Sequence, residues 1–162
     1  MSELAIVYHP IGTIHSPFVE VAGMPIQPSG ATGVRGWIEI LPRYAQGLND
    51  LDGFSHIILL YHFHRVHKMR LQVLPFLDTE QRGLFATRAP TRPNPIGLSV
   101  VKLVSVQENV LHVENLDILD GTPLLDLKPY VPQFDVHPAD RTGWLEQAQG
   151  EARERRSDER FR

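Results

Sequence analysis

Two arginines and an asparagine stand within a proline-rich stretch, FATRAPTRPNPIGLS, at residues 85–99. Each proline of this stretch fixes its own φ angle and biases the preceding residue toward an extended conformation. The loop is therefore stiff before a ligand arrives, which lowers the entropy cost of presenting Arg88, Arg92 and Asn94 to that ligand. A turn that merely connects two strands is the alternative, but such a turn has no need of guanidinium groups held so close together.

The basic side chains around this stretch favour an anionic substrate. The whole chain carries a net charge of −3, yet the only acids of residues 65–92 are Asp78 and Glu80. The basic residues of the same segment are Arg65, Lys68, Arg70, Arg82, Arg88 and Arg92. A solvated surface without a partner would have the same composition, whereas a basic region in an acidic protein is typical of anion binding.

A second polar stretch, DGTPLLDLKPY, occupies residues 120–130 and contains Asp120, Asp126, Lys128 and Tyr130. Asp126 and Lys128 stand two residues apart, so in an extended segment they point to the same side. They would then form a charge pair or face a shared ligand. A turn followed by a surface ion pair is the simpler interpretation.

The histidines of HFHRVH raise the question of a metal site. His62 and His64 would share one face of a strand, but a third ligand would have to come from elsewhere. Because the HExxH spacing is missing, we interpret His62, His64 and His67 as hydrogen-bonding groups at the end of a buried strand and expect no metal. His64 and Arg65 would then line a pocket where that strand emerges.

Several classes of site and location are excluded or disfavoured by what the chain lacks. Without cysteine it has no disulfide, thiolate ligand or thiol nucleophile, which suits a cytoplasmic protein. It contains neither GxGxxG nor GxxxxGK[ST], so no Rossmann or P-loop nucleotide site is expected. It also lacks GxSxG, so we do not expect a covalent hydrolase. No window approaches the roughly 20 apolar residues of a membrane span, so we expect no membrane contact.

The hydrophobic pattern predicts a protein built almost entirely from strands. The expected strands cover residues 8–15, 34–40, 56–64, 71–76, 96–106 and 110–119, the last two forming a hairpin, and residues 41–48 form a short helix. Prolines should keep the extended segment within residues 120–132 out of a central ladder. The fold class is all-β, either a compact barrel with one or two short helices or an open, strongly curved sheet.

One domain is expected. We assign residues 1–139 to the barrel and residues 140–162 to a short helix followed by a charged, flexible tail.

Three stretches together resemble a known family. GLFATRAPTRPNPIGLSVVKL, LDILDGTPLLDLKPYVP and GWIEILPRYAQGLNDLDGFSHIILLYHFHR are similar to motifs of the TrmO family (also YaeB, TsaA-like or VirR-like) of tRNA threonylcarbamoyladenosine methyltransferases. The resemblance covers about residues 8–135. It implies a non-Rossmann β-barrel that binds S-adenosylmethionine, works as a homodimer and methylates N6 of threonylcarbamoyladenosine beside the anticodon of a tRNA.

The resemblance also implies the site residues. The cofactor site would comprise Pro25, Ile26, Gln27, His64, Arg65, Arg88, Leu98, Asp126, Leu127, Lys128 and Pro129. The catalytic group, near the transferred methyl or the modified base, would comprise Arg92, Asn94, Asp126, Lys128 and Tyr130. Bacterial relatives often have arginine where this chain has Ile26, so a contact made by that arginine is not expected here. Many bacterial members also carry a further C-terminal domain, whereas a charged tail follows the barrel in this chain.

Methyl transfer mainly requires alignment of the reactants and exclusion of water. We expect Asp126 to act as the local base or orienter, and Arg92 to grip the carboxylate of the threonylcarbamoyl group. Two alternatives stay open. One is a nonenzymatic RNA-binding barrel, and the other is the same methyl transfer to a different acceptor.

Overall fold

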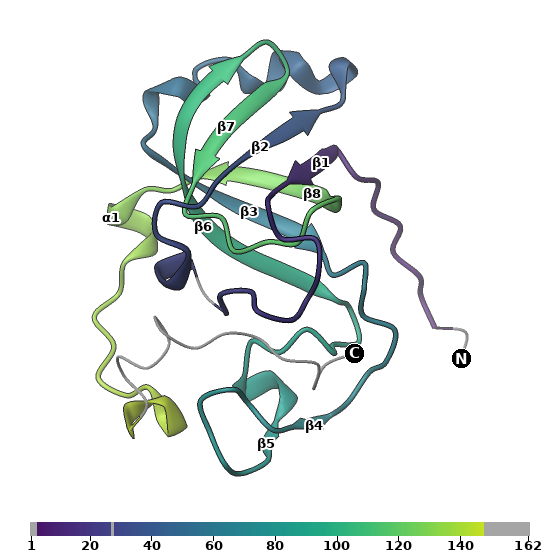
Figure 1. Cartoon of the computed structure of the whole chain (residues 1–162), viewed down its shortest axis with the longest axis vertical. Coiled ribbons are helices and arrows are strands. Elements are labelled where there is room, and N and C mark those ends of the chain that lie inside the picture. Colours follow the sequence, from purple (N-terminus) through teal and green to yellow (C-terminus); the bar gives the residue numbers. More distant parts are fainter. Residues whose placement is uncertain (1–2, 27, 148–162) are drawn as a thin grey trace.

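The longer strands of the protein close into a barrel and two short strands form a separate sheet (Figure 1), in a computed structural model that describes residues 3–26 and 28–147. The strands are β1 (Gly12–His15), β2 (Arg35–Ile40), β3 (His56–His62), β4 (Gln72–Val73), β5 (Arg82–Gly83), β6 (Ile96–Gln107), β7 (Val110–Glu114) and β8 (Thr122–Pro129). The helices are short: α1 (Pro132–Asp135) and the 3-10 helices η1 (Pro28–Ala31), η2 (Pro42–Leu48), η3 (Leu51–Gly53), η4 (Leu84–Ala86) and η5 (Gly143–Gln147).

The barrel has the strand order β1-β2-β7-β6-β3-β8, and every neighbouring pair is antiparallel. Closure by the β1–β8 pair confirms the predicted all-β barrel and removes the open-sheet alternative, since a closed barrel leaves no free sheet edge. Side chains alternate between the interior and the outer surface along β3, where Ile57, Leu59 and Tyr61 are buried. Their inward row belongs to the single large core of the barrel.

The predicted hairpin is present as β6 and β7. Glu108 and Asn109 form the turn between them, with Glu108 at a φ of 55°. The amide of Asn109 donates a hydrogen bond to the carbonyl of Ile40, over 2.7 Å, which ties this turn to β2. The hairpin therefore holds the middle of the barrel in register with its neighbours.

The expectation that prolines exclude residues 120–132 from a central ladder was wrong. β8 pairs with both β1 and β3, and so it closes the barrel. Pro129 is the last residue of β8 and Pro132 is the first of α1, so neither interrupts the ladder. A register shift opposite Leu60 and Tyr61 absorbs one residue of β8 as a bulge.

Other predicted elements differ from the structure mainly in length. The strand expected at residues 8–15 is reduced to β1, because the side chains upstream, such as Val7 and Tyr8, are exposed. The strand expected at residues 71–76 is reduced to β4, which pairs only with β5. The helix expected at residues 41–48 is the 3-10 helix η2, and η5 lies where the short C-terminal helix was expected. The charged tail was predicted within residues 140–162, of which residues 148–162 lie outside the described residues.

Three connections leave the same end of the barrel, which we call the loop end, whereas residues 41–55 connect β2 to β3 at the opposite end. Residues 16–34 follow β1, residues 63–95 follow β3 and residues 115–121 follow β7, and each of these strands runs toward that end. Residues 63–95 form a small lobe with β4, β5 and η4 and its own core of Val73, Leu84 and Ala89 (Figure 1). The barrel therefore brings the proline-rich loop together with residues 16–34 and 115–121 at one end.

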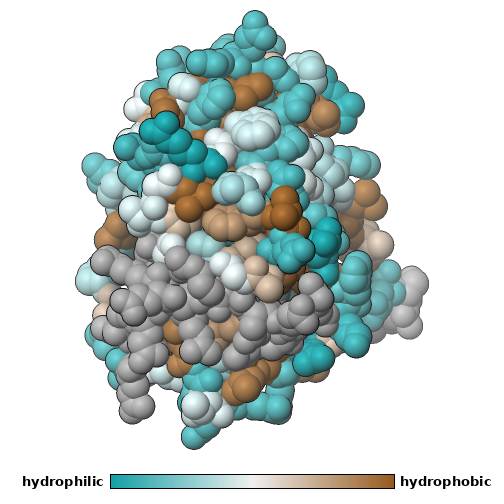
Figure 2. All heavy atoms as spheres, in the orientation of Figure 1, coloured by the Kyte–Doolittle hydropathy of each residue, from teal (hydrophilic) through white to brown (hydrophobic). Residues whose placement is uncertain are grey.

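In the face shown by Figure 2, hydrophobic residues form small patches among hydrophilic ones. None of the helices in the described part of the chain has the length and hydropathy needed to cross a membrane.

Candidate functional site

The proline-rich loop is rigid in the way its sequence predicts. Two tight turns lie within it, since Arg92 N–H donates to Pro90 O over 2.8 Å and Ile96 N–H donates to Asn94 O over 2.7 Å. The loop is also tied to the strand that precedes the lobe, because Phe63 N–H donates to Pro95 O over 2.8 Å. Its backbone is therefore held at the loop end before any ligand binds.

Arg92 uses part of its guanidinium to hold this loop together. Its Nη1 donates to the carbonyls of Thr87 (2.9 Å), Ala89 (3.2 Å) and Leu84 (3.4 Å), and its guanidinium carbon lies 5.6 Å from the centre of the Phe85 ring. The hydrogen bonds of this side chain that the described structure contains all go through Nη1. A ligand would therefore meet Arg92 through Nη2 or Nε, and the predicted grip on a carboxylate stays a prediction.

Gly97 allows the loop to enter β6 against the aromatic side chains of β3. A Cβ atom at this position would lie 2.3 Å from Tyr61 Cε2 and 2.8 Å from Phe63 Cζ. The two rings meet edge to face, with centroids 5.4 Å apart. The close approach needs glycine, so this residue places the loop directly over the end of the barrel core.

A buried chain of hydrogen bonds lies beneath the loop end of the barrel. The sequence patterns did not single it out. Ser99 is 1% exposed, and its hydroxyl donates to Asp117 Oδ1 over 2.8 Å. Tyr61 Oη lies 3.0 Å from the same hydroxyl oxygen. Burial raises the pKa of the Asp117 carboxyl to about 6, while the Ser99 hydrogen bond and the positive charge of Arg88 act in the opposite direction. No sequence pattern marked Ser99 as functional, since it lies outside a GxSxG motif, and the signal for Asp117 was its place in LDILD within a family motif.

His64 and Asp120 form a second polar group at the same end. Burial is the main cause that lowers the pKa of His64, and the neighbouring Arg65 adds to it, whereas Asp120 opposes both. Asp120 Oδ1 accepts the Ser16 N–H over 3.0 Å and lies 3.5 Å from His15 Nδ1. Asp120 thus fastens residues 16–34 to residues 115–121, while Arg65 and Arg88 are exposed beside them.

Of the predicted residues of β6 and β8, Leu98, Asp126 and Lys128 lie on the outer face of the barrel. Leu98 pairs with Leu60 of β3, which pairs with Asp126 of β8, so the three form one row across the sheet. Leu98 is 53% exposed. Leu127 points the other way and packs against the core, so of the predicted cofactor residues it is the one directed inward here. We call the row of Leu98, Leu60 and Asp126 the outer row.

Lys128 and Tyr130 extend this face away from the loop end. Lys128 Nζ lies 2.9 Å from Asp126 Oδ2, with both side chains about half exposed. Tyr130 lies beside the first residue of β3, since its N–H donates to His56 O over 3.0 Å and its ring meets the His56 ring edge to face. His56 and His62 are the two ends of β3, about 20 Å apart at the usual strand rise. One chain therefore holds Tyr130 well away from Arg92 and Asn94.

The predicted residues of the first long loop are only partly described. Pro25 is buried and Ile26 is half-buried, and both precede η1, which contacts β6. Gln27 lies outside the described residues. Among the described residues no group of three or more His, Cys, Asp and Glu side chains is placed to hold a metal ion.

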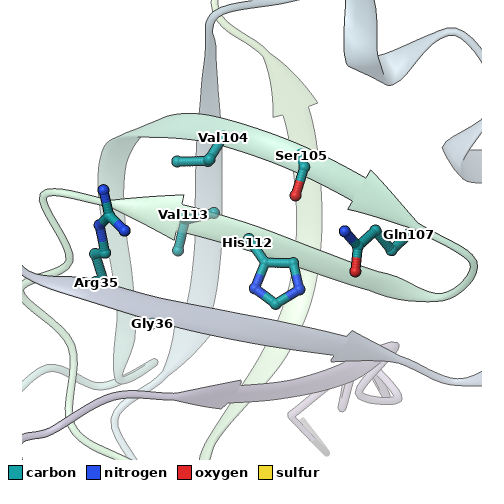
Figure 3. Close-up of a pocket in the computed structure, with 7 residues that line it drawn as sticks. All are labelled: Arg35, Gly36, Val104, Ser105, Gln107, His112 and Val113. Atoms are coloured by element: carbon teal, nitrogen blue, oxygen red, sulfur yellow. The ribbon is translucent and has the colours of Figure 1, made fainter.

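A surface pocket of about 300 Å³ lies elsewhere, on the outer side of β2, β7 and β6 (Figure 3). It opens beside the register shift between Leu103 and Ser105. Its lining residues are Arg35, Gly36, Val104, Ser105, Gln107, His112 and Val113. This set contains none of the residues predicted for the site.

Comparison with known proteins agrees with this arrangement. Residues 13–136 match the family described as the tRNA-methyltransferase O N-terminal domain. The chain is 54% identical over 158 residues to a "Probable S-adenosyl-L-methionine-binding protein" of Pyrococcus abyssi, covering 98% of this chain and 86% of that protein. It is 37% identical over 134 residues to the mouse tRNA (adenine(37)-N6)-methyltransferase, covering 78% of this chain but only 31% of the mouse protein.

A solved structure is also similar. The crystal structure of TrmO from Pseudomonas aeruginosa superimposes with a TM-score of 0.73 at 39% identity, over 87% of this chain and 63% of that one. A family match over most of the barrel and a shared fold at this identity lead to one conclusion. This chain belongs to the tRNA-methyltransferase O family.

Proposed function

We propose that the protein is an S-adenosylmethionine-dependent methyltransferase that modifies N6 of threonylcarbamoyladenosine next to the anticodon of a tRNA. The observation that carries the proposal is the meeting, at one end of the barrel, of residues 63–95 and 115–121, which contain parts of the family's motifs. Relatives named for S-adenosylmethionine binding and for methylation of adenine 37 support it.

The residues present fit the proposed cofactor in chemical type. When bound, S-adenosylmethionine supplies a methyl group on a positively charged sulfur. Leu98 and Leu60 offer an apolar surface for a ring, and the Asp126 carboxylate and Lys128 ammonium offer partners for opposite charges. The proposed cofactor-binding set also includes residues at the loop end, namely Pro25, Ile26, His64, Arg65 and Arg88. Its remaining members, assigned from the resemblance to the family, are Gln27, Leu127 and Pro129.

The tRNA would approach the loop end. Arg65, Lys68, Arg70 and Arg88 are exposed there or on the adjoining lobe, so they can meet the phosphate backbone. An anticodon loop is single-stranded, and its bases can be splayed out and read by stacking. Arg92 and Asn94 would face the modified adenosine, and Arg92 would bind the threonylcarbamoyl carboxylate.

The test is mass spectrometry of nucleosides from tRNA incubated with the protein and S-adenosylmethionine. We expect a mass gain of one methyl group on threonylcarbamoyladenosine, and stabilisation of the protein by the cofactor in a thermal shift. Binding of tRNA without cofactor stabilisation would indicate a nonenzymatic RNA-binding barrel. Cofactor binding with a methyl group on another nucleoside would show that the acceptor is different.

We further propose that the protein acts as a homodimer in which each site takes residues from both copies. The separation of Tyr130 from Arg92 and Asn94 along β3 supports this, because a second copy would supply what one chain holds apart. Mixing Arg92→Ala with Tyr130→Ala would then restore activity at hybrid sites. Light scattering that finds only monomers under assay conditions would contradict the dimer.

A further inference from the structure

Asp117 has no part in the site described so far, although it lies in the shortest loop of the loop end. Its Oδ1 accepts the Ser99 hydroxyl proton over 2.8 Å. Ser99 has one proton to give, so the 3.0 Å contact with Tyr61 must be donated by the tyrosine. The hydrogen bonds therefore run in one direction, from Tyr61 through Ser99 to the carboxylate.

This chain of hydrogen bonds orients the Asp117 carboxylate, and the hydroxyls of Tyr61 and Ser99 stay protonated. Burial raises the pKa of the Tyr61 phenol well above its usual range, and the charge of Asp117 adds to the effect. Tyr61 thus stays a donor at every pH at which the protein would work. The charged and titratable groups that face Asp117 are Tyr61 from β3 and Arg88 from the lobe, and Ser99 supplies the hydrogen bond from β6.

Asp117 differs from Asp126 in the property that a proton acceptor needs. Asp126 is half exposed and paired with Lys128 at 2.9 Å, so an ammonium group already stabilises its charge. Asp117 is partly buried, and burial brings its pKa to about 6, near a physiological working pH. A general base is most effective when its pKa lies close to the pH of the reaction.

We propose that Asp117 accepts the N6 proton of the acceptor adenine during methyl transfer, an inference that rests on the proposed function. The N6–H bond breaks as the N6–carbon bond forms, and the electron pair of the broken carbon–sulfur bond stays on sulfur. The proton moves to Oδ2 of Asp117, because Oδ1 already accepts the hydroxyl of Ser99. It then leaves to solvent when the product departs.

The test is the pH dependence of single-turnover methylation of tRNA that carries threonylcarbamoyladenosine. In the wild type the rate should rise with pH through a midpoint near 6. Asp117→Asn should lower the rate by about 100-fold or more and remove that midpoint, since general bases contribute about 10²–10⁴-fold. Asp52→Asn, at an exposed position of η3, is the matched control and should leave the profile unchanged.

Ser99→Ala supplies a second test that does not depend on the folding of the asparagine variant. Because the Ser99 hydrogen bond lowers the pKa of Asp117, its loss should move the midpoint to higher pH. The carboxyl carbon-13 resonance of Asp117 should titrate with the same shift in cofactor-free protein. A purely structural role for Ser99 would lower stability without moving either midpoint.

The outcomes separate the two proposals. If the wild type methylates the tRNA but Asp117→Asn keeps its rate and its midpoint, Asp117 is not the proton acceptor and the proposed function stands. A kinetic midpoint that stays in place in Ser99→Ala while the Asp117 carbon-13 midpoint moves has the same meaning. If the wild type does not methylate this tRNA, the proposed function fails, and the role of Asp117 fails with it.

Discussion

The loop end and the outer row hold carboxylates in opposite surroundings. Asp117 lies against buried hydroxyls, at the point where the core of the barrel meets its long loops. Asp126 lies on the open face of β8 with a lysine beside it. A barrel can thus place two acidic groups nine residues apart in the sequence and give them different chemistry, because burial changes the pKa of one while solvent and an ion pair surround the other.

The largest expected effect is the difference in stability between truncating a side chain in the barrel core and truncating one on the outer row. Leu59→Ala removes a fully buried core side chain and should lower the free energy of unfolding by about 2–5 kcal/mol. Leu98→Ala, on the outer row, should change it by less than about 0.5 kcal/mol but weaken S-adenosylmethionine binding. Urea denaturation and calorimetry measure the two effects. Equal destabilisation would show that the outer row is covered in the working protein.

The next effect tests how tightly the loop end is packed. Gly97→Ala would bring a methyl group to 2.3 Å from the Tyr61 ring, so we expect a loss of about 1–3 kcal/mol of stability by urea denaturation. Gly53→Ala is the control, since a Cβ atom there would meet nothing within 4 Å. If both variants are as stable as the wild type, the contact of β6 with Tyr61 is looser than the structure describes.

A smaller effect is the pH dependence of stability that Asp117 causes. Its folded pKa of about 6 is higher than the unfolded value of roughly 3.9, so the folded state binds the proton more tightly. The stabilising contribution is complete below about pH 4 and is lost as the pH rises through 6. As the pH rises through this range, the free energy of unfolding of Asp117→Asn should therefore increase relative to that of the wild type by about 1–2 kcal/mol. One pKa unit corresponds to about 1.4 kcal/mol, and the partial exposure of Asp117 reduces the effect. If the denaturant midpoints of Asp117→Asn and of the wild type differ by the same amount at every pH in this range, the pKa of Asp117 is not raised.

The smallest expected effect belongs to the outer ion pair. Asp126→Asn should change the free energy of unfolding by about 1 kcal/mol or less, since both partners are about half exposed. Its proposed role instead predicts weaker cofactor binding, measured by calorimetry. Cofactor affinity and single-turnover rate that both match the wild type would remove Asp126 from the site.

Local patterns were enough to predict the rigid loop, the hairpin and most strand positions. Prolines restrict neighbouring angles wherever they occur, and alternation of side chains follows from strand geometry, so both can be inferred without knowing the fold. The family motifs identified the segments that meet at the loop end. The same local reasoning misjudged β8, because whether Pro129 interrupts a ladder depends on where the strand ends.

The residue pattern alone specifies an all-β domain of this family with a stiff basic loop. Which polar groups are buried together depends on the folded barrel, because Tyr61, Ser99 and Asp117 come from two strands and a loop. The folded barrel also decides that Asp126 and Asp117 face different environments, and that one chain keeps Tyr130 apart from Arg92. The physical reason is that burial, and the pKa shifts that follow from it, depend on neighbours brought together across the barrel, which no local spacing specifies.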